Sequence, residues 1–127
     1  MRLVTAAIIQ KENTVLLARR GPGSTLSGFW EFPGGKVEEG ETPEQCLIRE
    51  LEEELNISCR VEGLLCESIY TYDHGCFKIL ALHTEWIRGD LSLKDHDEVR
   101  FVPIKDLYDY RLLPADIPIA RQLNSTF

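Results

Sequence analysis

The sequence predicts an α/β protein in which a mixed β-sheet has helices packed on its faces. Three observations support this class. The patterns follow the order strands, helix, strands, helix; the first helix pattern is amphipathic; and 43% of the 127 residues are apolar. An order of this kind buries its apolar faces by packing helices against a sheet. The length fits a single domain that spans residues 1–127.

Two strands and a loop are predicted at the start of the chain. Residues 3–9 are mainly aliphatic and β-branched, and the polar residues 10–13 separate them from a second apolar run at 15–18. This pattern is typical of two strands joined by a turn. Glycine, proline and serine then cluster, which predicts a loop over residues 20–29 before a short strand at 30–32.

The best-marked element is a helix from residue 43 to about residue 55. Thr42 is a favourable N-cap, Pro43 suits the first helical position, and Gln45 stands where a capping box requires it. An apolar stripe at i, i+4 spacing prepares one face for burial, and it consists of Leu47, Leu51 and Leu55.

A long hairpin and a terminal helix are predicted in the second half. Residues 59–72 and 76–87 have the composition of strands, with an Asp-His-Gly turn signal between them. A short strand at 99–102 and a helical turn at 103–108 follow. A proline-led segment then starts the last helix, which is predicted to end near residue 123.

The net charge of −7 and the sequence pI near 4.9 restrict the possible partners. A polymeric nucleic acid requires a basic surface that neutralises its phosphates, so we do not expect one as a partner. A small anionic ligand fits an acidic chain when cations bridge the two. The sequence shows neither a membrane-spanning run nor a signal-peptide pattern. We therefore expect a cytoplasmic protein whose four cysteines are reduced thiols, although counting alone also allows two disulfides.

Three carboxylates share one face of the predicted helix. Glu50, Glu53 and Glu54 are related by i+3 and i+4 spacings, which place side chains beside one another. Like charges at these spacings repel, so the helix alone gains nothing from them. One interpretation is a solvated acidic surface. The other is a site for a hard cation such as Mg²⁺, which prefers oxygen ligands.

The residues around this face favour the cation site. Gly34 and Gly35 precede the helix, and glycine lets the backbone expose its amides and carbonyls at close range. Arg49 can pair with Glu53 at i+4, or bridge back to Glu41, and hold the acids in place.

The spacing of these residues resembles the Nudix box. Five residues separate Gly35 from Glu41, and seven more separate Glu41 from the run Arg49-Glu50-Leu51-Glu52-Glu53-Glu54-Leu55-Asn56-Ile57. One position departs from the family pattern, which usually has glycine where this chain has Asn56. Glycine ends the helix there in the left-handed conformation, and asparagine is the next most suitable residue.

The resemblance extends to the MutT branch of that family, which degrades nucleoside triphosphates. Residues 30–38, Trp-Glu-Phe-Pro-Gly-Gly-Lys-Val-Glu, and residues 114–118, Pro-Ala-Asp-Ile-Pro, are both similar to that branch. The resemblance implies the Nudix fold, an α/β/α sandwich with a mixed sheet. It also implies Mg²⁺-dependent hydrolysis of a nucleoside triphosphate to the monophosphate and pyrophosphate, with Mn²⁺ as a substitute.

The resemblance also implies residue roles. The expected metal ligands are the three helix carboxylates and one backbone carbonyl, namely Glu50, Glu53, Glu54 and either Gly34 or Gly35. Two residues, Glu41 and Arg49, are expected to orient these ligands. The number of metal ions stays open.

A late segment often supplies a further base or metal ligand in this family. Residues 94–98 are the candidate here, and Asp95 matches best, with Glu98 as the rival. The same composition is also typical of a solvated charged loop. The general base therefore stays open among these two and the helix carboxylates Glu50 and Glu53. His96 has a suitable intrinsic pKa, but a lone loop histidine is more often merely exposed, so it is not in the predicted catalytic set.

Substrate contacts are expected at Arg20, Lys36 and Asp116. Arg20 opens a glycine-rich loop and Lys36 lies in the box loop, although both also suit an ordinary surface. An ionised Asp116 accepts hydrogen bonds only, which favours donor-rich base edges such as the cytosine amino group. Helix N-capping is its alternative role. Aromatic candidates for stacking on the base are Phe32, Tyr72 and Phe77, although aromatic residues in strands more often belong to the core.

The predicted function is a (d)NTP diphosphatase of nucleotide-pool sanitation. By resemblance, its substrates are CTP, modified dCTP or 8-oxo-dGTP. Two alternatives remain, a Nudix hydrolase of ADP-ribose or a nucleotide sugar, and a non-catalytic nucleotide-binding module. The module predicts lost box carboxylates, whereas all of them are present. A monomer and a homodimer are both compatible with the sequence.

Overall fold

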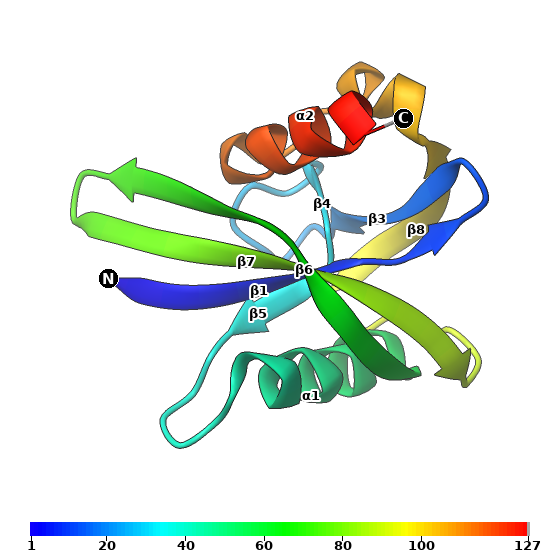
Figure 1. Cartoon of the computed structure of the whole chain (residues 1–127), viewed down its shortest axis with the longest axis horizontal. Helices are drawn as coiled ribbons and strands as arrows, with labels where there is room; N and C mark the ends of the chain where they lie inside the picture. Colours follow the sequence, from blue (N-terminus) through cyan, green and yellow to red (C-terminus); the bar gives the residue numbers. More distant parts are fainter. Residues whose placement is uncertain (127) are drawn as a thin grey trace.

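The computed structural model describes residues 1–126, which form two four-stranded sheets between two helices (Figure 1). The first sheet has the order β5-β1-β7-β6 and consists of β5 (Gly34–Lys36), β1 (Arg2–Ile8), β7 (Gly75–Arg88) and β6 (Ser58–Tyr72). The second sheet consists of β2 (Gln10–Lys11), β3 (Thr14–Arg20), β4 (Trp30–Glu31) and β8 (His96–Pro103). The helical elements are α1 (Pro43–Leu55), η1 (Ile104–Asp109), η2 (Pro114–Asp116) and α2 (Ile117–Thr126).

The strand directions confirm the predicted mixed sheet. In the first sheet β1 runs parallel to β7, while β5 is antiparallel to β1 and β6 is antiparallel to β7. The second sheet is antiparallel throughout. The α1 helix lies on one side of the strands and α2 on the other, so the predicted α/β/α sandwich is confirmed (Figure 1).

Two hydrophobic cores follow from the alternation of side chains along the strands. Ala6 and Ile8 of β1 point into a core that includes Leu123 of α2. Ala7 and the following Ile9 point into the opposite core, which contains the leucine stripe of α1. Side chains alternate between the faces of a strand, so one strand of continuous apolar sequence supplies both cores.

The α1 helix begins and ends as predicted. The Thr42 hydroxyl accepts a hydrogen bond from the backbone N–H of Gln45 at 3.1 Å, and the Gln45 side chain accepts one from the Thr42 N–H at 2.9 Å. The helix is followed by Asn56 in the left-handed conformation, with φ 61° and ψ 35°. The stripe of Leu47, Leu51 and Leu55 is fully buried, which orients the adjacent acidic face toward the strand β5.

Two segments differ from the sequence prediction. Residues 34–36 form the strand β5, because glycine at position 34 allows the backbone to approach Thr5 so closely that a Cβ would overlap the Thr5 carbonyl. The charged segment predicted as a loop ends at residue 95, and His96–Pro103 is the strand β8. Pairing with β3 extends this strand beyond its apolar part, because ladder hydrogen bonds do not require apolar side chains.

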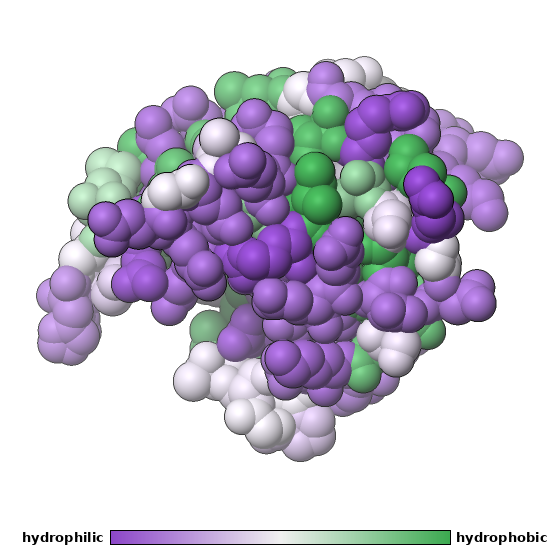
Figure 2. All heavy atoms as spheres, turned by 90° about the horizontal axis from the view of Figure 1, so that it is seen from below, coloured by the Kyte–Doolittle hydropathy of each residue, from purple (hydrophilic) through white to green (hydrophobic). Residues whose placement is uncertain are grey.

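The face of the molecule that includes the outer side of α1 is mostly hydrophilic (Figure 2). None of the helices within residues 1–126 is long and apolar enough to span a membrane.

Candidate active site

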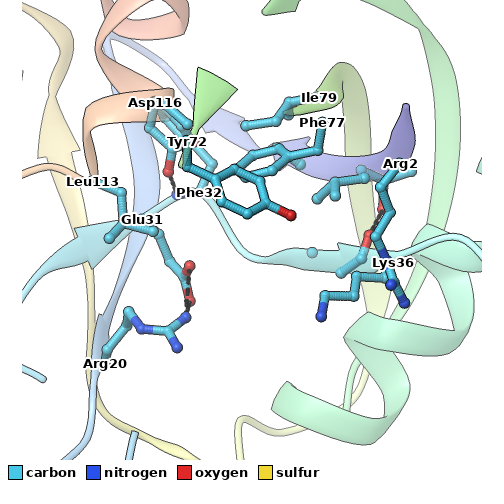
Figure 3. Close-up of a pocket in the computed structure, with 16 residues that line it drawn as sticks. Arg2, Arg20, Glu31, Phe32, Lys36, Tyr72, Phe77, Ile79, Leu113 and Asp116 are labelled. Atoms are coloured by element: carbon cyan, nitrogen blue, oxygen red, sulfur yellow. Dashed lines mark hydrogen bonds and ion pairs between the residues drawn. The ribbon is translucent and has the colours of Figure 1, made fainter. Parts of the chain in front are cut away.

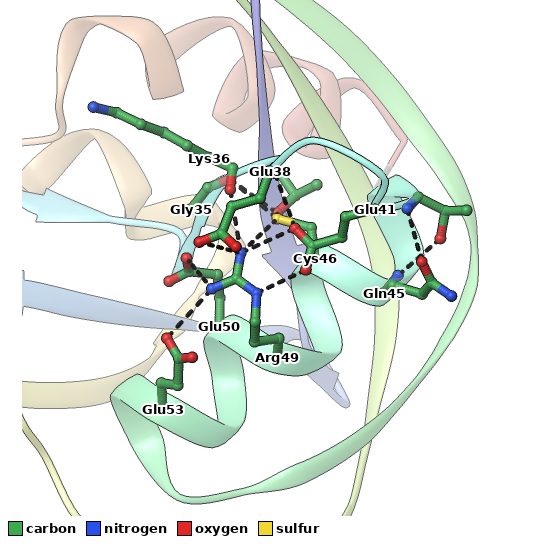
Figure 4. A network of polar contacts seen from close by, with 11 residues as sticks. Gly35, Lys36, Glu38, Glu41, Gln45, Cys46, Arg49, Glu50 and Glu53 are labelled. Carbon is green, nitrogen blue, oxygen red and sulfur yellow. Dashed lines mark hydrogen bonds and ion pairs between the residues drawn. The ribbon is translucent and has the colours of Figure 1, made fainter.

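Arg49 is the centre of a polar network on α1 (Figure 4). Its guanidinium donates to Glu41 at 2.7 and 3.0 Å, to Glu50 at 3.0 Å and to Glu53 at 3.3 Å. The sequence predicted a pairing with either Glu53 or Glu41, and both pairings are present together. Hydrogen bonds from Arg49 lower the pKa of Glu41 to about 2, so Glu41 is a permanent anion that holds the guanidinium in place.

The Glu50 carboxylate lies directly over Gly35 of β5. A Cβ built on Gly35 would lie 2.6 Å from Oε2 of Glu50 and would overlap the rest of the carboxyl group. Glycine at position 35 is therefore required by a close approach of side chain to backbone. Burial raises the pKa of Glu50, and the neighbouring Arg49 opposes that rise.

The two candidate carbonyls of β5 face different directions. Thr5 pairs with Gly35 in the antiparallel ladder. The bonds that flank this pair run from Ala7 N–H to Pro33 O at 2.7 Å and from Val37 N–H to Leu3 O at 3.0 Å. In an antiparallel ladder, residue pairs that hydrogen-bond to each other alternate with pairs that do not. The Thr5–Gly35 pair is therefore a hydrogen-bonded pair, so the Gly35 carbonyl bonds to β1. It also accepts a hydrogen bond from Oγ1 of Thr5 at 3.3 Å. By the same alternation the Gly34 carbonyl points away from β1, and within residues 1–126 it accepts no hydrogen bond outside the strand ladder.

A second group of carboxylates meets in a small cavity beside this carbonyl. The cavity has a volume of about 150 Å³, and its lining includes Gly34, Glu54, Asp95 and His96. Burial raises the pKa of Glu54, and the negative charge of Asp95 raises it further. The rival Glu98 does not share this environment, because it pairs with Arg19 and Arg100 on β3 and β8.

The cavity and its surroundings fit a divalent cation. The donors are carboxylate and carbonyl oxygens, which suit a hard ion, and burial beside Asp95 raises the pKa of Glu54 even though His96 opposes that rise. Within residues 1–126, however, no three acidic, histidine or cysteine side chains already converge into a metal cluster. Glu53 illustrates the reason, because its side chain is 50% exposed and is turned toward Arg49.

The three residues predicted to contact the substrate line one pocket of about 360 Å³ (Figure 3). Asp116 and Lys36 lie on opposite sides of this pocket, with the rings of Tyr72 and Phe77 between them. Arg20 forms part of the wall, and this residue also lines the smaller carboxylate cavity. The two hollows therefore adjoin.

Asp116 differs from its sequence-based description in two respects. Its carboxylate accepts a hydrogen bond from the backbone N–H of Phe32 at 3.1 Å, and within residues 1–126 it makes none to α2, so the side chain does not cap that helix. Burial, together with the charge of Glu31, raises the pKa of Asp116 to about 8. A protonated Asp116 is therefore favoured at neutral pH, whereas the prediction from sequence had an ionised one.

Glu31 and His96 are parts of the site that the sequence prediction omitted. Nε2 of His96 lies 2.7 Å from the Glu31 carboxylate, which also accepts from Arg20 at 3.2 Å. Glu31 lines both hollows, and Nδ1 of His96 is buried without a partner among the described residues. A signal for Glu31 was present, since a glutamate between the apolar Trp30 and Phe32 faces the opposite side of a strand.

A stability measurement can test the state of Asp116. A carboxyl group whose pKa rises from an ordinary value near 4 to about 8 on folding binds its proton more tightly in the folded state. The stabilisation is complete below about pH 4 and is lost as the pH rises toward about 8. Asp116→Asn cannot ionise and still offers an oxygen to the Phe32 N–H. We expect its Tm to exceed that of the native protein by roughly 5–10 °C at the alkaline end of this range.

The measurement is thermal unfolding across this pH range for both proteins. The difference in Tm should shrink toward the acidic end, where Asp116 of the native protein is protonated in both the folded and the unfolded state. Asp73→Asn serves as the control, because Asp73 is exposed in the turn between β6 and β7. Parallel pH profiles for the native protein and Asp116→Asn would contradict a raised pKa.

Comparison with known proteins agrees with this geometry. A family model described as the NUDIX domain matches residues 1–123. The chain is 36% identical over 116 residues to the CTP pyrophosphohydrolase of Escherichia coli, in an alignment that covers 91% of this chain and 86% of the relative. It is 51% identical over 95 residues to the 8-oxo-dGTP diphosphatase of Proteus vulgaris, in an alignment that covers 74% of this chain and 84% of that relative. The solution structure of the E. coli ORF135 protein superimposes with a TM-score of 0.89 at 34% identity, covering 98% of this chain and 89% of that one.

The sandwich fold, the acidic face of α1 and the adjoining pocket define a hydrolase. The chain belongs to the Nudix family. Its resemblance to pyrophosphohydrolases and to MutT-like proteins is therefore a family relationship. Nudix hydrolases act on small nucleotide substrates and generally need a divalent metal ion.

Proposed function

We propose that this enzyme hydrolyses nucleoside triphosphates to the nucleoside monophosphate and pyrophosphate. One observation carries the proposal: the pocket that holds Asp116 adjoins the carboxylate cavity, and Arg20, Glu31 and Gly34 line both. A base bound near Asp116 would place its phosphate chain toward the carboxylates. The names of the relatives support the same reaction class.

The metal ion of this proposal is Mg²⁺, with Mn²⁺ as a substitute. Its ligands would be Glu50, Glu53, Glu54 and the Gly34 carbonyl, which is the one of the two candidates that points away from β1. When bound, the ion neutralises phosphate charge and lowers the pKa of a coordinated water. Arg49 keeps Glu50 and Glu53 oriented, and Glu41 keeps Arg49 in place.

Asp95 is the general base of this proposal. It lies in the cavity with Glu54, whereas Glu98 is occupied by ion pairs outside it. The proton of the attacking water passes to the Asp95 carboxylate as the water oxygen bonds to a phosphorus. The anhydride P–O bond then breaks, and the electron pair stays on the departing phosphate oxygen.

The cationic residues of the pocket position the substrate. Lys36 is exposed on β5 beside Gly35, where its ammonium group can reach a phosphate. Arg20 is held by Glu31 at 3.2 Å and by the Thr25 carbonyl at 2.6 Å, so its guanidinium is pre-oriented at the junction of the two hollows. A pre-oriented arginine loses less side-chain freedom when a phosphate binds.

Asp116 would contact the base, and its protonation state determines which edge it accepts. A protonated carboxyl group donates one hydrogen bond and accepts others, while a carboxylate only accepts. The protonated form suits a base edge that presents a carbonyl beside an N–H or amino group, and the ionised form suits donors alone. CTP, modified dCTP and 8-oxo-dGTP are the proposed substrates, consistent with the names of two relatives.

A substrate panel tests this function. Release of the nucleoside monophosphate should be measured with Mg²⁺ for the ordinary nucleotides, 5-modified dCTP, 8-oxo-dGTP, ADP-ribose and a nucleotide sugar, and pyrophosphate release should be measured as well for the triphosphates. We expect kcat/KM for CTP-type or 8-oxo-dGTP substrates to exceed that for the other triphosphates by at least about tenfold, the effect of one well-placed polar contact. Asp116→Asn should change this ranking. Turnover of the sugar or ADP-ribose without turnover of any triphosphate would refute the proposal.

A further inference from the structure

The residue at the end of α1 does more than end the helix. Asn56 is left-handed, and its backbone N–H bonds to the Glu52 carbonyl at 3.1 Å, which glycine would do equally well. Unlike glycine, Asn56 has a side chain. Its Nδ2 donates to the Asp90 carbonyl at 3.1 Å. The departure from the family pattern thus adds a contact between the helix end and a distant segment.

That segment, residues 90–95, is attached along the last turn of α1. Two backbone bonds follow the Asn56 contact in order, from the Ser92 N–H to the Leu55 carbonyl at 3.1 Å and from the Lys94 N–H to the Glu54 carbonyl at 3.3 Å. These bonds satisfy carbonyls that a helix end otherwise leaves without partners. The segment therefore runs back along the helix from Asn56 toward the residue that carries the Glu54 carboxylate.

The far end of the segment is held by the loop after β3. The Gly21 N–H donates to the Asp95 carbonyl at 3.1 Å, and a Cβ on Gly21 would overlap that same carbonyl. The near end is equally close-packed, because a Cβ on Gly89 would lie 2.7 Å from the Asn56 carbonyl. Asp95 is thus the last residue of a short strap that is fixed at both ends.

We infer that Asn56 is a positioning residue, whose side chain holds residues 90–95 on α1 and thereby places the Asp95 carboxylate beside Glu54. Within residues 1–126 it is the only side chain of α1 or its cap that hydrogen-bonds to the backbone of this segment. The inference rests on the proposed function, because it assigns Asp95 a part in the reaction. It predicts that glycine, the family's usual residue at this position, gives a lower kcat than asparagine in this chain.

The test compares Asn56→Gly with the native protein and with Asn13→Gly. Glycine retains the left-handed helix end and removes only the side chain, while Asn13 is an exposed turn residue that lines neither hollow of the site. Asn56→Asp keeps the size but replaces the donor with an acceptor that faces the Asp90 carbonyl. Hydrogen exchange of the Ser92 and Lys94 amides reports on the strap without depending on activity.

We expect exchange of these two amides to rise about fivefold in Asn56→Gly, the factor that corresponds to one neutral hydrogen bond. We expect kcat to fall by a factor of about three to ten, as for a misplaced catalytic group, while KM stays unchanged. Asn56→Asp should behave like Asn56→Gly, and Asn13→Gly like the native protein. In an Asp95→Asn background, Asn56→Gly should cause no further loss of kcat, because both changes act on the same group.

The possible failures are distinguishable. Native exchange and native kcat in Asn56→Gly would overturn the inference, as would an additive loss of kcat in the double variant. A native kcat in Asp95→Asn would instead contradict the proposed role of Asp95, and the exchange measurement would still report whether Asn56 holds the strap.

Discussion

Glu53→Gln is expected to lower kcat by about 10²–10⁴-fold, because loss of one carboxylate ligand removes several kcal/mol of stabilisation from a metal-assisted transition state. The side chain is 50% exposed and its carboxylate lies 3.3 Å from Nη1 of Arg49. Glutamine has the same length and can keep a polar contact there. The fold should therefore remain intact, with thermal unfolding close to that of the native protein.

Glu52→Gln is the matched control for this prediction. Glu52 belongs to the same helix and is exposed, but within residues 1–126 it is not among the acids that pair with Arg49. The measurement is Mg²⁺-dependent pyrophosphate release at saturating substrate. A native rate in Glu53→Gln, or an equal loss in both variants, would show that Glu53 is not a ligand.

Gly35→Ala is expected to lower kcat by about 100-fold, the scale on which a displacement of about 1 Å affects a positioned catalytic group. Alanine would add a Cβ that lies 2.6 Å from Oε2 of Glu50, so the Glu50 carboxylate must move. The β1–β5 ladder prevents the backbone from yielding easily, because Gly35 pairs with Thr5 in its middle. The side chain of Glu50 therefore carries most of the displacement.

Gly63→Ala gives the appropriate comparison. Gly63 also lies in a strand, but a Cβ built there has no neighbour within 4 Å. We expect native kcat and a nearly native Tm for this control. If Gly35→Ala retains native turnover, the contact between Glu50 and β5 does not constrain the site. If both variants lose activity equally, the effect lies in strand formation and not in the position of Glu50.

Local sequence patterns predicted α1 and its acidic face because the information is contained within a few turns. The capping residues, the leucine stripe and the three glutamates all follow from i+3 and i+4 spacing. The pairing of Arg49 with Glu53 is equally local. The bond from Arg49 to Glu41 joins residues eight positions apart, and a helix with one preceding turn still brings these residues together.

Longer-range features were predicted incompletely. The strand β5 was missed because glycine has low strand propensity, and only its close approach to Thr5 makes that pairing favourable. The first residues of β8 were predicted as a loop because they are charged, yet their backbone pairs with β3. His96 was set aside as an isolated residue, and its partner Glu31 lies 65 positions away in the sequence.

Residue spacing along the chain was enough to predict the family, the helix and the carboxylates on its face, since these depend on positions within one element. Only the packing of distant segments showed which carbonyl of β5 points away from β1, which late acid lies beside Glu54, and that Asp116 is buried against the Phe32 N–H, 84 positions away. The physical reason is that ladder register, desolvation and side-chain proximity arise only when distant segments pack together, and these three quantities set the chemistry of the site.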